Sequence, residues 1–292
     1  MKKILITGAN SYIGTSFENY INTNYPGEYK VDTVDMLDGS WRERSFAGYD
    51  AVFHVAGIAH SDTGKVSDER RAMYFKVNTE LTIETAKKAK ADGVKQFIFM
   101  SSAIVYGDSA PIGKHKTITK DTVPQPSNFY GDSKLQAENG ILPLQSNEFN
   151  VVVLRPPMIY GKGCKGNYQI LVKLALKLPF FPYVKNERSV LYIENLCEFV
   201  RLMIDNNEQG VFWPQNAEYS NTSEMVKLIA KAHGRKIYLV KGFRWMLVIM
   251  SRFSGLVNKA FGNLTYDMSL SQYVLPLYNL EKSIELTERT NG

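Results

Sequence analysis

Two side chains four residues apart, Tyr130 and Lys134, could together move a proton. They open a stretch with a helical pattern, and positions four apart share one face of a helix, so the phenol and the ammonium point into one site. A phenol has an ordinary pKa of ~10, and a neighbouring cation lowers that pKa by favouring the phenolate. Lys134 supplies that cation, so the pair indicates acid/base chemistry.

Hydroxyl groups follow the apolar segment Gln96–Met100, where Ser101 and Ser102 stand directly after its last residue. In open α/β sheets, ligands bind at the carboxyl ends of the strands. The two serines are therefore candidate site residues, although a serine pair at a strand end also serves as a helix cap. Each of these motifs is common by itself. The serine pair and the Tyr130–Lys134 pair indicate a catalytic site because they follow, in this order, a loop of the type that binds nucleotides.

That loop follows the apolar segment Lys3–Thr7 and leads into an amphipathic helix. Gly8 and Gly14 occupy the outer glycine positions of a dinucleotide-binding turn, and Ser11 stands at the middle position. Ser11 either caps the helix or donates to a phosphate. The backbone amides at the helix N-terminus, where the helix dipole favours an anion, are those of Tyr12 and Ile13.

An acidic residue at the end of the second strand is the expected partner of an adenosine ribose. Asp35 ends the segment Lys30–Asp35, and its carboxylate would accept hydrogen bonds from the ribose hydroxyls and repel a 2′-phosphate. This favours NAD over NADP as the cofactor. Asp32 and Asp38 remain alternative partners.

The order of apolar and helical segments predicts the fold class. Strand-type and helix-type segments alternate through the first half of the chain, which predicts an α/β fold of Rossmann type, a doubly wound parallel sheet with helices on both faces. We expect this NAD-binding domain over residues 1–160. A smaller α/β substrate domain is expected over residues 161–292, with a strand and helix near 188–206 returning to the first domain or its border.

Composition excludes several classes of protein. The chain has 292 residues, a net charge of +6 and two cysteines, Cys164 and Cys197, without the spacing of a disulfide framework or a metal site. The basic residues are dispersed, so we expect no nucleic-acid partner. The apolar run after the first residues is too short for a signal core, and none reaches the ~20 residues of a membrane span, so a cytoplasmic protein is expected.

One segment of the second half, Phe243–Phe261, mixes aromatic and aliphatic residues with flanking arginines. Such a pattern occurs in helices that lie on a membrane surface. Packing inside the smaller domain is the alternative, and the small number of charges on the polar face favours it.

With these motifs in this order, the sequence resembles the extended short-chain dehydrogenase/reductase family, in particular its NAD-dependent nucleotide-sugar epimerases. The resemblance covers nearly the whole chain. It depends on the following motif residues: Thr7, Gly8 and Gly14; Asp50–Gly57; Asn78; Gly93, Val94 and Phe97; Ser101, Ser102 and Val105–Gly107; Tyr130 and Lys134; and Arg155–Pro157 with Tyr160 and Gly161.

The resemblance implies roles for these positions. Tyr130 is then the acid/base, Lys134 lowers its pKa and holds the nicotinamide ribose, and Ser102 hydrogen-bonds the reacting sugar oxygen. Asn78 is implied as a supporting residue below the site, and His54 as a core residue. Further implied cofactor contacts are Val55, Ala56, Gly57, Asn78, Ser101, Tyr130 and Pro157. In the smaller domain, Asn167 and Arg188 are implied to hold the nucleotide diphosphate, while a surface ion pair is the alternative for Arg188.

The activity that the resemblance implies is 4-epimerisation of a UDP-hexose or a UDP-N-acetylhexosamine through a 4-keto intermediate. A reductase or dehydrogenase of a related sugar is the first alternative, and a non-enzymatic dinucleotide sensor is another. Ala103 and Ile104 stand where related sugar dehydratases carry an acid/base Asp-Glu pair, so dehydration is not expected. A setting in polysaccharide precursor synthesis and a homodimer, paired through helices within 73–91 and 130–144, are also implied.

Overall fold

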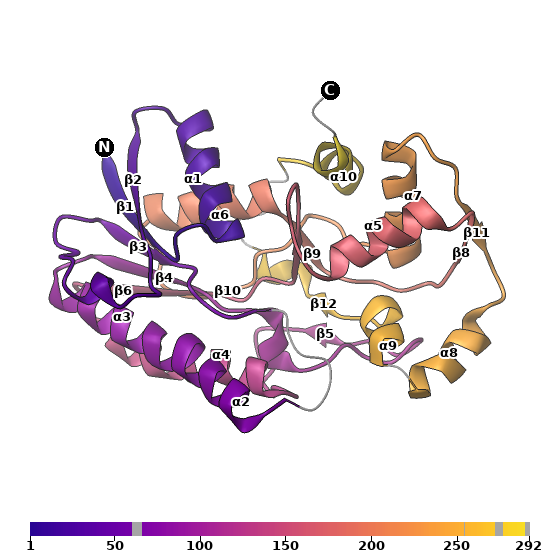
Figure 1. The fold of residues 1–292 in the computed structure, drawn as a ribbon, viewed down its shortest axis with the longest axis horizontal. Helices are drawn as coiled ribbons and strands as arrows, with labels where there is room; N and C mark the ends of the chain where they lie inside the picture. Colours follow the sequence, from indigo (N-terminus) through magenta and orange to yellow (C-terminus); the bar gives the residue numbers. More distant parts are fainter. Residues whose placement is uncertain (60–65, 254, 272–276, 290–292) are drawn as a thin grey trace. The chain divides into compact units, whose positions relative to one another are not determined.

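The computed structural model describes residues 1–59, 66–253, 255–271 and 277–289, and these form two compact units that interleave along the chain (Figure 1). Unit 1 comprises residues 1–107, 124–156 and 196–213, and unit 2 comprises residues 108–123, 157–195 and 214–292. The division into an NAD-binding domain over residues 1–160 and a substrate domain over residues 161–292 stays a prediction.

Unit 1 is built on one parallel sheet of six strands in the order β10-β6-β4-β3-β1-β2. Its strands are β1 (Lys2–Thr7), β2 (Tyr29–Val34), β3 (Ala51–His54), β4 (Gln96–Met100), β6 (Asn150–Leu154) and β10 (Gly210–Phe212). Every residue of β3 and β4 is buried, as expected for strands covered on both faces. From β1, the chain first adds β2 on one side of the sheet and then β3 on the other side. Open α/β sheets bind their ligands at such a point, where the order of the strands reverses.

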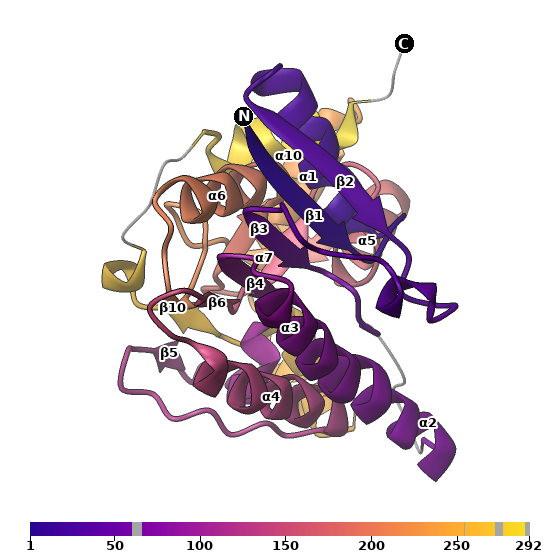
Figure 2. The same ribbon diagram turned by 90° about the vertical axis from the view of Figure 1, so that its left-hand side faces the viewer.

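Helices cover both faces of this sheet. The helices of unit 1 are α1 (Tyr12–Asn24), α2 (Asp68–Tyr74), α3 (Leu81–Ala91), α4 (Phe129–Ile141) and α6 (Ile193–Asp205), the last from residue 196 on. Figures 1 and 2 show α1 and α6 on one face and α2, α3 and α4 on the other. The predicted Rossmann-type doubly wound fold is confirmed.

Unit 2 holds short paired strands and the remaining helices. Its strands form three parallel pairs: β5 (Thr117–Ile118) with β12 (Thr265–Tyr266), β7 (Met158–Tyr160) with β9 (Val190–Tyr192), and β8 (Phe180–Pro182) with β11 (Tyr238–Val240). Its helices are α5 (Asn167–Lys177), α7 (Thr222–Ala232), α8 (Arg244–Phe253), α9 (Gly255–Phe261) and α10 (Leu280–Glu288).

Candidate active site

The turn between β1 and α1 requires glycine at Gly8. The backbone there is left-handed, with φ +104°, and a Cβ atom would lie 2.8 Å from the backbone nitrogen of Ala56. The amides of Gly8 and Ala9 both donate to the carbonyl of Val34 at the end of β2, at 3.0 and 3.1 Å. The turn therefore brings the start of α1 beside the ends of two neighbouring strands.

Ser11 caps helix α1. Its hydroxyl accepts a hydrogen bond from the amide of Gly14 at 3.1 Å, so the capping alternative is the one observed. A Cβ atom on Gly14 would lie 2.7 Å from that hydroxyl and 3.0 Å from a methyl of Ile6, so only glycine lets α1 approach β1 this closely. Amides in the first turn of a helix have no acceptor within the helix, and this first turn includes Tyr12 and Ile13. The site thus fits a dinucleotide diphosphate.

Of the three candidate acids near β2, Asp35 directly follows the strand and is exposed. One of its oxygens accepts from the Leu37 amide at 2.9 Å. Asp32 instead accepts from the Tyr49 hydroxyl, and Asp38 accepts from Ser40. This arrangement favours Asp35 as the ribose partner, and that role stays a prediction.

Tyr130 and Ser102 come together at the carboxyl edge of the sheet. Asn128 caps α4 by accepting from the Gly131 amide at 2.9 Å, and this places Tyr130 in the first turn. Burial raises the pKa of the Tyr130 phenol to about 12, while a side-chain hydrogen bond with Ser102 acts in the opposite direction. Ser102 also caps the short helix 103–106 through the amide of Ile104. The structure thus brings together two side chains to which the resemblance assigns catalytic roles, and those roles stay predictions.

Lys134 lies one helical turn further along α4 and is buried. Its ammonium donates to the carbonyl of Met100 at 2.9 Å and lies 4.7 Å from the centre of the Phe99 ring. Burial lowers the pKa of Lys134 to about 8, and the nearby Glu138 carboxylate acts in the opposite direction. Desolvation is the largest cause of the raised Tyr130 pKa, and the prediction that Lys134 lowers this pKa stays a prediction.

Asn78 connects three segments below this pair. Its amide oxygen accepts from the Ile58 amide at 2.8 Å, and its nitrogen donates to the Ile58 carbonyl and the Ser133 hydroxyl, each at 3.1 Å. Ser133 in turn donates to the carbonyl of Tyr130 at 2.8 Å. Asn78 is therefore connected to the backbone of Tyr130 through Ser133, and its supporting role stays a prediction.

Two other motif positions of β3 and the turn after it are explained by packing. His54 is fully buried between the hydroxyls of Thr7 at 2.6 Å and Thr82 at 3.0 Å, and burial lowers its pKa to about 3. It is therefore neutral in the core. A Cβ atom at the exposed Gly57 would lie 3.2 Å from the Lys134 ammonium, so glycine keeps the backbone close to that nitrogen.

A buried ion pair next to the site was missed in the sequence. Glu138 and Arg155 are paired at 2.6 Å, Ser101 donates to the same carboxylate, and Arg155 donates to the Tyr106 hydroxyl at 2.6 Å. Glu138 is four residues after Lys134, so the spacing 130, 134, 138 could have identified it as part of one helical face.

In unit 2, the structure gives no contact between Asn167 and Arg188 within the described residues. Asn167 is exposed at the start of α5. Arg188 donates to the Gly262 carbonyl at 3.1 Å and to the Ser109 hydroxyl at 3.4 Å, and burial lowers its pKa to about 10. The surface ion pair considered for Arg188 is absent among the described residues. Pro157 is the first residue of a segment of unit 2.

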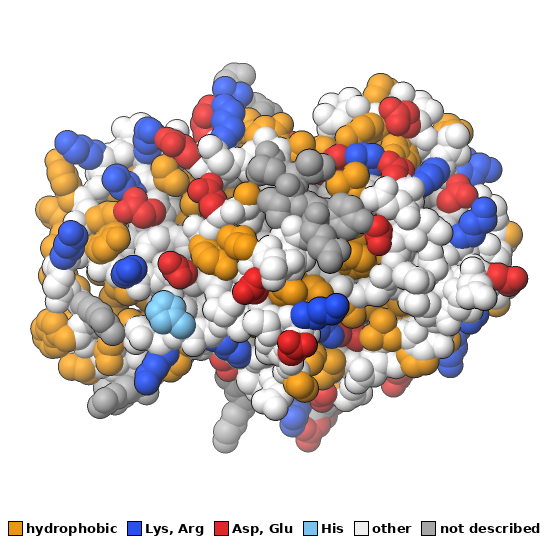
Figure 3. Space-filling model, turned by 180° about the vertical axis from the view of Figure 1, so that it is seen from behind, with side chains coloured by type: hydrophobic (Ala, Val, Ile, Leu, Met, Phe, Trp, Pro, Cys, Tyr) orange, Lys and Arg blue, Asp and Glu red, His pale blue; other side chains and the backbone are white. Residues whose placement is uncertain are grey.

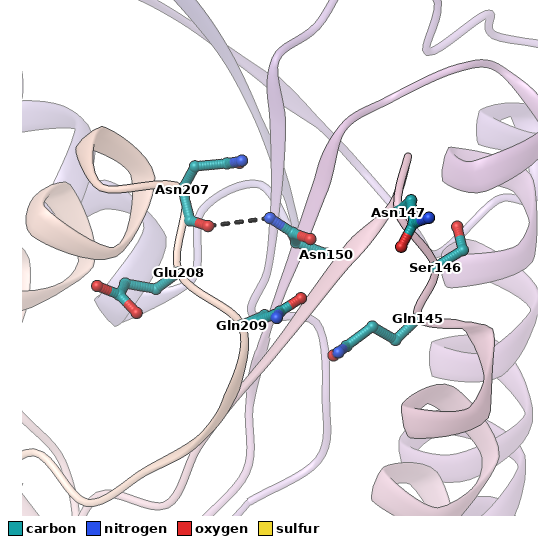
Figure 4. Close-up of a pocket in the computed structure, with 7 residues that line it drawn as sticks. All are labelled: Gln145, Ser146, Asn147, Asn150, Asn207, Glu208 and Gln209. Atoms are coloured by element: carbon teal, nitrogen blue, oxygen red, sulfur yellow. Dashed lines mark hydrogen bonds between the residues drawn. The ribbon is translucent and has the colours of Figure 1, made fainter.

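A polar hollow of about 690 Å³ lies elsewhere in unit 1 (Figure 4). Asn150, which donates to the Asn207 carbonyl at 2.9 Å, begins β6, and Gln209 precedes β10. The hollow therefore opens at the amino ends of the strands, away from the candidate catalytic residues. Among the described residues, no cluster of His, Cys, Asp or Glu could hold a metal ion, and no helix there is long and apolar enough to cross a membrane.

These features define a dinucleotide-binding protein with a Ser, Tyr and Lys constellation at the carboxyl edge of its sheet. The chain belongs to the NAD dependent epimerase/dehydratase family, whose model matches residues 4–212. The resemblance seen in the sequence is thereby confirmed, and so is NAD as the cofactor.

Two curated relatives are 4-epimerases by name. The chain is 29% identical over 301 residues to a UDP-glucose 4-epimerase from Vibrio cholerae, covering 94% of this chain and 90% of the relative. It is 26% identical to an N-acetyl-alpha-D-glucosaminyl-diphospho-ditrans,octacis-undecaprenol 4-epimerase from Escherichia coli O157:H7, covering 80% and 73% of the two chains.

Solved structures share the fold at lower sequence identity. RMD from Pseudomonas aeruginosa, complexed with NADPH, has a TM-score of 0.75 at 19% identity and 98% coverage of both chains. UDP-glucuronic acid 4-epimerase from Bacillus cereus, complexed with NAD, has a TM-score of 0.71 at 18% identity and covers 98% of this chain and 97% of its own.

Proposed function

We propose that this protein is an NAD-dependent 4-epimerase of a sugar carried on a nucleoside diphosphate, with a UDP-hexose or a UDP-N-acetylhexosamine as substrate. The observation that carries the proposal is the closeness of the Ser102 and Tyr130 side chains at the carboxyl edge, with Lys134 one turn away. The names of the two curated relatives support 4-epimerisation. The absence of carboxylates at positions 103 and 104 argues against dehydration.

In the proposed reaction, Tyr130 takes the proton of the sugar 4-hydroxyl as that carbon is oxidised, and returns it when the ketone is reduced on its other face. Ser102 donates to the reacting oxygen and keeps it within reach of the phenol. Lys134 holds a positive charge below pH 8 and fixes the end of β4 through Met100. NAD, when bound, accepts and returns the hydride and adds the positive charge of its ring.

The residues that would hold NAD are those of the β1–α1 turn and the neighbouring strand ends. Gly8, Gly14 and the first-turn amides of α1 would contact the diphosphate, and Asp35 would accept from the adenosine ribose. The negative charge of Asp35 favours NAD over NADP, because it would repel the 2′-phosphate of NADP. Arg188 in unit 2 remains the proposed partner of the substrate diphosphate, since a guanidinium matches phosphate geometry.

The test is incubation of the purified protein with a panel of UDP-sugars without added NADH, followed by separation of the stereoisomers. Epimerisation without NADH consumption supports the proposal. Consumption of NADH in proportion to a keto-sugar would assign the protein to the reductases instead. The Tyr130→Phe variant should lose about a thousandfold or more in turnover, as expected for loss of an acid/base group, while still binding nucleotide. Full activity in that variant would contradict the proposal.

The expected homodimer, paired through helices within 73–91 and 130–144, is kept as part of the proposal, and its test is the mass of the protein in solution. A cytoplasmic setting and a role in polysaccharide precursor synthesis are also part of the proposal. Packing of α3 against α4 within one chain leaves Gly140 in contact with Ile83, so an outer face of these helices would have to supply the interface.

A further inference from the structure

Two long stretches of unit 2 contain no acidic residue. Residues 225–266 hold eight lysines and arginines and neither Asp nor Glu, and residues 161–186 hold five lysines and likewise no acid. The net charge of the chain is only +6, so this separation of charge is local. Such stretches favour contact with an anionic surface.

The two stretches are joined in space by the strand pair β8 and β11. Phe180 on β8 pairs with Tyr238 on β11, and their rings lie 5.8 Å apart. Both side chains are exposed, Phe180 by 59% and Tyr238 by 51%. Two aromatic rings thus stand side by side in contact with water.

Helix α8, which follows β11, adds further exposed apolar side chains. Trp245 is 67% exposed, and Ile249, which lies on the same helical face, is 48% exposed. Leu247 is buried and fixes the opposite side of the helix. The packing expected for segment Phe243–Phe261 therefore applies to Leu247 and Phe261 but not to this face, while residue 254 lies outside the described residues.

Cations lie against aromatic rings in the same region. The ammonium of Lys236 lies 5.2 Å from the centre of the Tyr238 ring, and that of Lys241 lies 5.9 Å from the centre of the Tyr183 ring. Both lysines are exposed. Helix α8 lies at the right of Figure 1 and therefore on the left-hand side of Figure 3, which is turned by 180°. The left edge of Figure 3 shows hydrophobic side chains beside Lys and Arg side chains.

We propose that the basic-aromatic surface of unit 2, formed by Phe180, Lys236, Tyr238, Lys241, Trp245 and Ile249, binds the surface of a membrane that carries anionic headgroups. Aromatic side chains with one apolar and one polar side are favoured at the level of the headgroups, and lysine stems reach over apolar surface toward phosphates. A helix of ten residues is too short to cross a bilayer, so α8 would lie in the plane of the interface.

The charge of the surface distinguishes this occupant from a second copy of the chain. Two copies meeting through this face would bring like charges together, which opposes association, whereas anionic headgroups neutralise them. This inference does not depend on the proposed function, since it concerns a surface of unit 2 and not the residues that bind cofactor or substrate.

The experiment is sedimentation of the full chain with vesicles of phosphatidylcholine containing phosphatidylglycerol, compared with vesicles of phosphatidylcholine alone. We expect binding to the anionic vesicles that decreases with added salt, and a blue shift of the Trp245 emission on binding. Trp245→Ser with Ile249→Ser should weaken binding about tenfold or more, because it removes the apolar contribution. Lys236→Glu with Lys241→Glu should weaken binding by about fivefold or more for each position.

Matched controls are Val123→Ser and Lys120→Glu, two exposed positions of unit 2 outside this surface, which should bind as the unchanged protein does. Unfolding by urea shows that each variant is folded. Absence of binding to anionic vesicles, or equal binding to neutral ones, would overturn the proposal. So would a change in the mass of the protein in solution caused by Trp245→Ser with Ile249→Ser, without a change in vesicle binding, because the surface would then be an interface between copies.

Discussion

Replacing Lys134 by methionine should make the protein more stable and inactive at the same time. The buried ammonium has a pKa of about 8, against 10.5 for an exposed lysine. At pH 7 the folded protein therefore keeps a charged group in a buried position, which costs free energy. At about 1.4 kcal/mol for each pKa unit, this costs roughly 3 kcal/mol. Methionine removes that cost but leaves the Met100 carbonyl without its donor, a loss of about 1 kcal/mol. We expect the free energy of unfolding to rise by about 2 kcal/mol at pH 7.

The sign of the pH dependence follows from the lowered pKa. The folded state releases the Lys134 proton near pH 8, and the unfolded state keeps it up to about pH 10.5, so between these values the unfolded chain binds more protons. The stability contributed by neutral Lys134 is present above pH 10.5 and is lost as the pH falls through about 8. The advantage of the methionine variant should therefore shrink to about zero near pH 10.

The measurement is urea unfolding of both proteins between pH 7 and about pH 10, at constant ionic strength. Lys87→Met is the matched control, because Lys87 is exposed on the neighbouring helix α3 and should change stability by less than about 0.5 kcal/mol. A methionine variant that is less stable than the unchanged protein at pH 7, or a difference that stays the same across this pH range, would refute the reasoning.

Four further substitutions test the turn and the ion pair, each by urea unfolding. Gly8→Ala should lose about 1–3 kcal/mol and nucleotide affinity, since its Cβ would lie 2.8 Å from the Ala56 nitrogen at a left-handed φ; unchanged stability would contradict the tight turn. Ser11→Ala should lose about 1 kcal/mol as a lost cap, and Ser11→Gly less. Glu138→Leu should lose about 3–5 kcal/mol because it leaves Arg155 buried without its carboxylate, and a loss below 1 kcal/mol would show that water reaches that guanidinium.

The central strands could be predicted from the sequence because each is short, continuously apolar and bounded by a turn. Segments Gln96–Met100 and Ala51–Val55 match β4 and β3 within one residue. The turn at Gly8 and the cap at Ser11 were also recognisable, since a left-handed residue and an N-cap each restrict the residue type locally.

What the sequence did not reveal depends on contacts between distant segments. Glu138 and Arg155 lie on different elements, and nothing in the local sequence of either indicates that they pair. The rise of the Tyr130 pKa on burial could not be predicted for a related reason, because spacing gives the distance to a cation along a helix but not the amount of water that packing removes. Membership of β10 in the large sheet was missed as well, since Gly210–Phe212 is only three residues long.

The late position of β10 in the chain has a consequence for synthesis on the ribosome. Strand β6 is complete at residue 154, but its outer neighbour β10 ends at residue 212, after a whole segment of unit 2 has been made. Until then β6 presents an unpaired edge of buried-type residues, which is a template for pairing with another chain. A fragment that stops near residue 160 would keep this open edge permanently, so we expect it to aggregate, whereas nascent chains released after residue 213 can close it.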